Sequence, residues 1–380
     1  MPIDWTALIE TVFAPRAEDR GLAIAVDLPD DVVSDHAAWR SRRELAVEWY
    51  RELNASPVAA DRKVGLIAFR NARTNNGDLP PTGAVVTPET LPDHASGLDG
   101  LAAEPFDALF ARFTMILAPT EFSATAPLKL AARRLGFRAA SMPRFSPAMV
   151  DALGLDWDAV DRRCRRLAAL LDRADGASFV FEHATSKTTY ALELDLRHRS
   201  STPSGGVLRE PGTAGNLPSG ETYIVPYEGE AGEASRTAGE LPVELDGEVV
   251  VYRIEANRAV EVLTDGPVSR READTLVAEP AYGNLAELGL GVLADFGIRP
   301  MGEILLDEKL GLHIAFGRSD HFGGMVGAND FSSPDAVVHI DRVYLPETQP
   351  AIRVPRVDLH LDDGTSIPLM RDGRYAIEFA

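Results

Sequence analysis

Hydrophobic and polar residues in the first half of the chain follow two alternating patterns. Segments with apolar residues three to four apart predict amphipathic helices at 5–13, 35–53, 126–135 and 157–173. Asp35 is the expected N-cap of the second helix. Short apolar runs between the helices predict buried strands at 21–27, 63–69 and 113–118, with a loop rich in Asn, Gly, Pro and Thr at 71–90. This alternation is typical of a parallel sheet covered by helices, so we expect an α/β domain over residues 1–187.

The pattern changes near Lys187. Strands are predicted at 178–182 and 189–195, and from residue 188 onward short alternating segments predict antiparallel strands. The expected turns are the Asp-Gly pairs at 246–247, 265–266 and 363–364. Residues 199–215 are rich in Ser, Thr, Gly and Pro, which indicates a surface loop or a lid. We therefore expect a mixed α+β domain over residues 188–380.

Composition narrows the classes of partner. With 380 residues, 45% of them hydrophobic and 25% charged, the chain resembles an ordinary globular protein with two cores. A net charge of −20 argues against nucleic acid and anionic membrane surfaces as partners. The single cysteine, Cys164, excludes an intramolecular disulfide and fits a reducing compartment. We find no leader segment and no apolar run of membrane-spanning length, so a cytoplasmic location is expected.

The residues best suited to chemistry lie in the second domain. His339 and Asp341 alternate with apolar residues on a predicted strand, so their side chains share one face. His313 lies on another predicted strand, and Glu287 interrupts an apolar run. Imidazole and carboxylate ligands suit zinc, cobalt, manganese or iron rather than calcium. From spacing alone, a metal site and core histidines bonded to backbone carbonyls are both open.

Four segments, taken in order, resemble the aminopeptidase T family of metalloaminopeptidases. They are NLPSGETYIVP at 216–226, NLAELGLG at 284–291, LDEKLGLHIAFGR at 306–318 and HID at 339–341. The resemblance extends over roughly residues 208–363. It implies an N-terminal α/β domain, a homodimer and two divalent metals, held here by Glu221, Glu287, His313, His339 and Asp341.

The sixth ligand of the family, a tyrosine, has no counterpart in this chain. Asp320 stands at its position, followed by His321. If the strand continues from His313, His321 shares the face of the ligands, whereas a turn at Gly317 would bring Asp320 inward. The third alternative is that neither residue binds metal, and in each case we expect the second metal to be held more weakly.

A metal cage of this kind predicts hydrolysis. A bound divalent ion lowers the pKa of water and polarises a carbonyl group, which suits cleavage of an amide near a free amino terminus in a small peptide. Arg318 is a candidate to bind a carboxylate or an oxyanion. The glutamates Glu228, Glu230 and Glu233 fit a solvated loop, and none of them is assigned as the general base.

Two other functions remain open. One is a mononuclear iron dioxygenase of the dihydroxypyridine type, a distantly related group in which His339, Asp341 and a further histidine would hold the iron. Those enzymes are expected to have a histidine where this chain has Glu287. The other is a non-catalytic peptide-binding protein, which the missing tyrosine would favour. Zinc is the expected metal of the leading hypothesis, with cobalt or manganese as alternatives.

Overall fold

The computed structural model describes residues 3–333 and 336–379, which divide into two compact units. Unit 1 comprises Met1–Asp161 with Gly206–Ser219, and unit 2 comprises Arg162–Gly205 with Gly220–Ala380. This division differs from the predicted domains 1–187 and 188–380. The strand over 174–183 pairs with strands of unit 2, and the segment 206–219 returns to the sheet of unit 1. Such long-range pairings decide the division.

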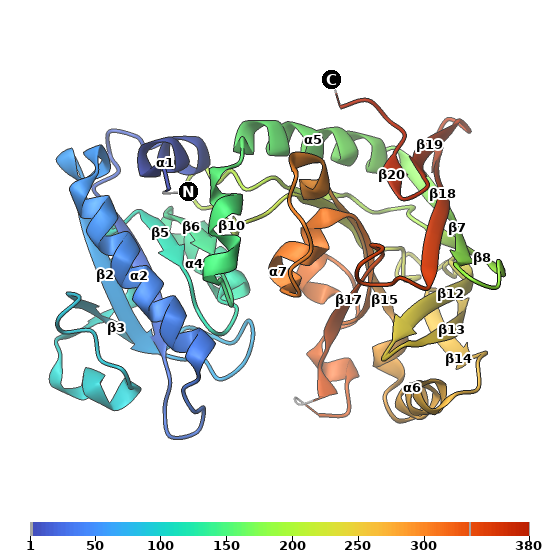
Figure 1. Cartoon of the computed structure of the whole chain (residues 1–380), viewed down its shortest axis with the longest axis horizontal. Helices are drawn as coiled ribbons and strands as arrows, with labels where there is room; N and C mark the ends of the chain where they lie inside the picture. The colour runs from blue at the N-terminus through green and yellow to red at the C-terminus, as the bar shows by residue number, and fades with distance from the viewer. Residues whose placement is uncertain (1–2, 334–335, 380) are drawn as a thin grey trace. The chain divides into compact units, whose positions relative to one another are not determined.

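Unit 1 is built on a seven-stranded sheet in the order β10-β6-β5-β1-β2-β3-β4 (Figure 1). Its strands are β1 (Gly21–Leu28), β2 (Lys63–Arg70), β3 (Thr82–Val86), β4 (Ala103–Pro105), β5 (Met115–Ala118), β6 (Arg138–Ser141) and β10 (Ala214–Asn216). The five strands from β10 to β2 run parallel, which confirms the predicted α/β architecture. The last two strands, β3 and β4, are each antiparallel to the strand before them in the sheet, and β3 lies within the predicted loop 71–90.

Helices cover this sheet. The α-helices of unit 1 are α1 (Trp5–Phe13), α2 (Ala37–Ala55), α3 (Phe106–Arg112) and α4 (Thr125–Leu135), and the sequence of α5 (Trp157–Leu171) runs from unit 1 into unit 2. Short 3-10 helices lie at Pro57–Ala60, Ala95–Gly100 and Pro147–Gly154. The prediction that Asp35 caps α2 was wrong. His36 accepts the N–H of Trp39 as the cap, because Asp35 instead binds the guanidinium of Arg43 through two hydrogen bonds of 3.1 and 3.0 Å.

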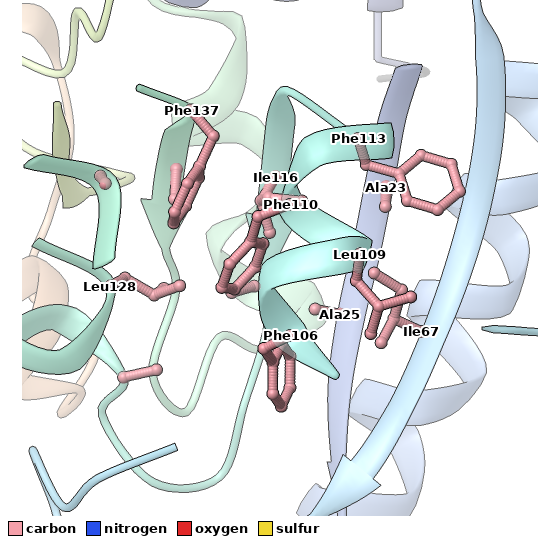
Figure 2. Packing of buried hydrophobic residues seen from close by; sticks show 14 of the residues in the cluster. Ala23, Ala25, Ile67, Phe106, Leu109, Phe110, Phe113, Ile116, Leu128 and Phe137 are labelled. Carbon is pink, nitrogen blue, oxygen red and sulfur yellow. The ribbon is translucent and has the colours of Figure 1, made fainter. Parts of the chain in front are cut away.

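An aromatic core lies between the sheet and the helices α3 and α4. Phe106, Leu109 and Phe110 of α3 belong to this core, and in Figure 2 Leu109 lies beside Ile67 of β2. The Phe110 ring stacks on Phe137, with 4.1 Å between ring centroids. Small alanines on β1 make room for these large rings, which fixes α3 against the sheet.

Unit 2 holds two antiparallel sheets. The eight-stranded sheet has the order β14-β13-β12-β8-β7-β18-β19-β20, and the five-stranded sheet has the order β17-β16-β15-β11-β9. The strands of the larger sheet are β7 (Ala174–His183), β8 (Thr189–Asp195), β12 (Ala238–Leu245), β13 (Glu248–Glu255), β14 (Arg258–Val262), β18 (Ile352–Leu361), β19 (Ser366–Arg371) and β20 (Arg374–Tyr375). The smaller sheet comprises β9 (Thr202–Ser204), β11 (Glu221–Ile224), β15 (Leu285–Gly291), β16 (Leu312–Gly317) and β17 (His339–Val343). The prediction of antiparallel strands in this half is confirmed.

Short helices connect these strands. They are the α-helices α6 (Pro267–Ala278) and α7 (Ile304–Asp307) and the 3-10 helices at Pro280–Gly283, Leu293–Phe296, Glu308–Leu310, Asp320–Phe322 and Ala328–Asp330. The Asp-Gly pairs at 246–247 and 363–364 form turns between paired strands, as predicted. The pair 265–266 does not, because Pro267 starts α6 directly after it. Within the described residues, no helix is both long and apolar enough to cross a lipid bilayer.

Candidate metal centre

Five predicted ligands lie on the smaller sheet of unit 2. These are Glu221 on β11, Glu287 on β15, His313 on β16, and His339 and Asp341 on β17. The register places Ala315 of β16 between Glu287 and Asp341 of the neighbouring strands. Residues directly opposite one another share a face, and so do residues two apart on one strand, so His313 and His339 project to that same face. Glu221 of β11 pairs with Gly291, which lies four residues after Glu287 on β15. Glu221 therefore projects to the same face, as the fifth ligand.

These side chains converge on two groups that share one carboxylate. The first group is Glu221, Glu287 and His313, and the second is Glu287, His339 and Asp341. The Nε2 atom of His313 lies 3.4 Å from Oε1 of Glu287 and 3.5 Å from Oε2 of Glu221. Nε2 of His339 lies 3.2 Å from the other oxygen of Glu287 and 3.5 Å from Oδ1 of Asp341. Either group could hold a divalent cation, with Glu287 between the two positions.

Two glycines of β15 make the arrangement possible. A Cβ atom at Gly289 would lie 1.8 Å from Nε2 of His313, so the imidazole occupies the space of the missing side chain. A Cβ atom at Gly291 would lie 2.2 Å from the backbone carbon of Lys309. Glycine is therefore required at both positions, because any side chain would displace a residue of the site.

Burial and mutual attraction fix the protonation of the groups. Burial would raise the pKa of Glu287, but hydrogen bonds with His313 and His339 outweigh it and lower that pKa to about 2. Burial would lower the pKa of His313, yet Glu287, Asp341 and Glu221 raise it to about 9. The pKa of His339 is likewise raised, because Asp341 and Glu287 outweigh the effect of burial. The carboxylates of Glu287, Asp341 and Glu221 thus strongly favour positively charged groups between them.

Backbone carbonyls orient both imidazoles. Nδ1 of His339 lies 2.8 Å from the carbonyl oxygen of Arg318, and Nδ1 of His313 lies 3.4 Å from that of Gly311. A proton on Nδ1 that points to a carbonyl leaves Nε2 as the coordinating atom, which is the usual arrangement of histidine ligands.

Lys309 and Glu308 belong to the site but were assigned no role from the sequence. Nζ of Lys309 donates to Oε1 of Glu221 at 2.5 Å and also to Glu308, and its side chain is 2% exposed. Burial and the neighbouring acidic groups Asp341 and Glu221 raise the pKa of Glu308 despite the attraction of Lys309. The only sequence signal was the charged pair placed between apolar residues in the segment 306–318.

The residues at the position of the missing tyrosine lie at the edge of the cluster. β16 ends at Gly317, whose φ of +103° begins a turn, so the alternative of a continuing strand does not hold. Asp320 accepts two hydrogen bonds from the Arg318 guanidinium, at 2.5 and 3.2 Å. The ring centroid of His321 lies 5.2 Å from that of His339. Neither Asp320 nor His321 is part of the two ligand groups.

Glu228 is not the solvated residue that its glycine-rich segment predicted. Its side chain is 5% exposed. The carboxylate accepts hydrogen bonds from Ser319 at 2.6 Å, from Asn284 at 2.8 Å and from the backbone N–H of Met325. Glu228 therefore connects the segment after β16 to Asn284, directly before β15, and its oxygens are engaged in structure.

Sequence comparisons agree with the motifs. No family model matches the chain. It is 27% identical over 242 residues to aminopeptidase T of Thermus aquaticus, an alignment that covers 58% of this chain and 54% of the relative. It is 31% identical over 187 residues to aminopeptidase T of Thermus thermophilus, covering 46% of this chain and 42% of the relative. The chain thus spans about half the length of the curated relatives that it matches.

Two solved structures share the fold over nearly the whole chain. The 2,5-dihydroxypyridine dioxygenase of Pseudomonas putida KT2440 has a TM-score of 0.57 at 14% identity, covering 98% of this chain and 95% of that one. Wild-type AmpT of Thermus thermophilus has a TM-score of 0.53 at 18% identity, covering 98% of both chains. The structural likeness concerns the fold alone. Together with the sequence matches it bears out the predicted resemblance: this chain is similar to aminopeptidase T in parts of its sequence and in its fold.

Proposed function

We propose that this protein is a metal-dependent hydrolase of the aminopeptidase type. The observation that carries the proposal is the pair of ligand groups that share Glu287. A carboxylate with one oxygen toward each of two cation positions is suited to a two-metal site, in which neighbouring ions orient a substrate and activate water. The similarity to aminopeptidase T supports the same class of reaction.

The side chains present fit a divalent ion. Oε2 of Glu221 is buried and has no hydrogen-bond partner, although it lies 3.5 Å from Nε2 of His313. An unpaired buried carboxylate oxygen is costly, and a cation would satisfy it. Oxygen and imidazole donors favour zinc, cobalt or manganese, and we propose zinc.

The protein's own contribution to the reaction is to hold these donors rigidly. A divalent ion in such a cage supplies water of lowered pKa and polarises the carbonyl group that is attacked. The carbonyls of Arg318 and Gly311 keep the imidazoles of His339 and His313 facing the ligand carboxylates. The guanidinium of Arg318 is engaged by Asp320, so we assign the role of Arg318 to its backbone oxygen. The acidic protein attracts the ammonium group of a small peptide substrate.

An iron dioxygenase is the second candidate, because the dihydroxypyridine enzyme shares the fold. Its expected ligands are two histidines and one carboxylate. Each of the two ligand groups found in the described parts of the chain contains only one histidine, and Glu287 belongs to both. This donor set favours the hydrolase.

Elemental analysis combined with substrate assays tests the proposal. Purified protein, without chelator, is analysed for bound metals and incubated with aminoacyl amides, dipeptides and dihydroxypyridines. We expect zinc, cobalt or manganese and the release of amino-terminal residues. Iron with oxygen consumption would instead establish the dioxygenase, and a metal-free protein without turnover would favour a peptide-binding role. Size-exclusion chromatography with light scattering tests the homodimer that the family resemblance implies.

A further inference from the structure

Lys309 is a buried cation fixed beside the proposed metal centre. Its ammonium group binds Glu308 and Oε1 of Glu221, and the residue is 1% exposed. Its backbone lies against β15 because Gly291 has no side chain there. Since lysine is rarely buried without paired carboxylates, this placement indicates a site built around the charge.

The two oxygens of Glu221 therefore have different surroundings. Oε1 accepts a hydrogen bond from Lys309 at 2.5 Å, whereas Oε2 is buried without a hydrogen-bond partner and faces His313. An ion between Glu221, Glu287 and His313 has only Oε2 of Glu221 freely available. Such an ion would also be near the positive charge of Lys309, which would oppose its binding.

The other ligand group has no such competitor. Among the described residues, no lysine or arginine side chain forms an ion pair with Glu287 or Asp341, whose ion-pair partners are histidines. We propose that Lys309 is a positioning residue that restricts Glu221 to one coordinating oxygen and makes its group the weaker of the two cation sites. This inference rests on the proposed function, and it assigns the order in which the two positions fill.

Zinc titration of the metal-stripped protein, monitored by isothermal titration calorimetry, tests the inference. The wild type should show one tight and one weaker event. Lys309→Met leaves two buried carboxylates without their cation and frees both oxygens of Glu221, so the weaker event should tighten by at least about tenfold. Lys309→Arg keeps the positive charge, so this variant should show one tight and one weaker event, as the wild type does.

A double variant guards against misfolding. Glu308→Gln combined with Lys309→Met removes both members of the ion pair and leaves no unpaired charge at residue 308. We expect the weaker event to tighten in this variant too, because the contact with Glu221 is lost. Circular dichroism checks that each variant is folded.

The outcomes distinguish the two proposals. If the wild type binds zinc in two events, and the weaker event has the same or a lower affinity in both folded variants, the role of Lys309 is overturned. The hydrolase proposal then still stands. No zinc binding by the wild type would overturn both.

Discussion

Replacement of Gly289 by alanine should prevent His313 from binding metal, although His313 itself is not substituted. The new Cβ atom would lie 1.8 Å from Nε2 of His313, 2.1 Å from Cε1 and 2.5 Å from Cδ2. Ordinary contact begins at 3.4 Å, so the imidazole must shift by about 1.6 Å. Productive ligand distances tolerate shifts of only about 0.2 Å. His313 should therefore no longer coordinate an ion in Gly289→Ala.

The size of the effect follows from the loss of one ligand. Removing residues that merely orient a ligand already weakens metal affinity by about 10- to 100-fold. Loss of His313 itself should cost at least about 100-fold, equivalent to about 2.8 kcal/mol at the affected position. The backbone is not expected to suffer, because alanine in a strand is by itself more stable than glycine by about 0.5–1 kcal/mol.

Zinc calorimetry on four variants measures this effect. Gly289→Ala and His313→Ala should lose the same event, and the double variant should be no weaker than His313→Ala, because both changes act through one imidazole. Gly100→Ala is the matched control, since nothing lies within 4 Å of a Cβ atom there. Wild-type affinity in a folded Gly289→Ala, or additive losses in the double variant, would refute the reasoning.

Four further predictions concern the same centre. Glu287→Gln should weaken both zinc events and lower peptidase activity by about two orders of magnitude or more, because Glu287 belongs to both groups; unchanged kinetics would return it to a structural role. His339→Ala and Asp341→Ala should each abolish the same single event with little loss of fold, and full activity in His339→Ala would contradict the assignment. Zinc must displace the proton that His313 holds below its pKa of about 9, so affinity should rise about tenfold per pH unit between pH 6 and 9, in contrast to the flat profile of a site with neutral histidines. Asp320→Ala should leave both zinc affinities nearly unchanged, as the Asp320 carboxylate binds Arg318; loss of one event would identify it as a ligand.

Features encoded locally could be predicted from the sequence. The alternation of polar and apolar residues identified the strands of His313 and of His339 with Asp341, since side-chain direction in a strand follows position alone. Glu287 stood out as a lone carboxylate in an apolar run, and the resemblance of the four motifs added Glu221. The parallel sheet of unit 1 followed from alternating helices and strands.

Features that depend on distant partners could not be predicted. The return of residues 206–219 to unit 1 depends on the pairing of β10 with β6, which no local pattern reveals. The burial of Lys309, in a 3-10 helix, depends on Gly291 of β15 and on the position of Glu221. Glu228 lies in a segment of solvent-exposed composition, yet it is buried and binds Asn284, directly before β15, and Ser319, after β16.

The central claim is that two cation positions share Glu287 in unit 2. The most direct test is anomalous X-ray diffraction at the zinc edge from crystals grown with zinc. The account predicts two peaks, one beside Glu221 and His313 and one beside His339 and Asp341, each within about 2.2 Å of an oxygen of Glu287. Zinc bound only elsewhere, or in a position that does not contact Glu287, would contradict it.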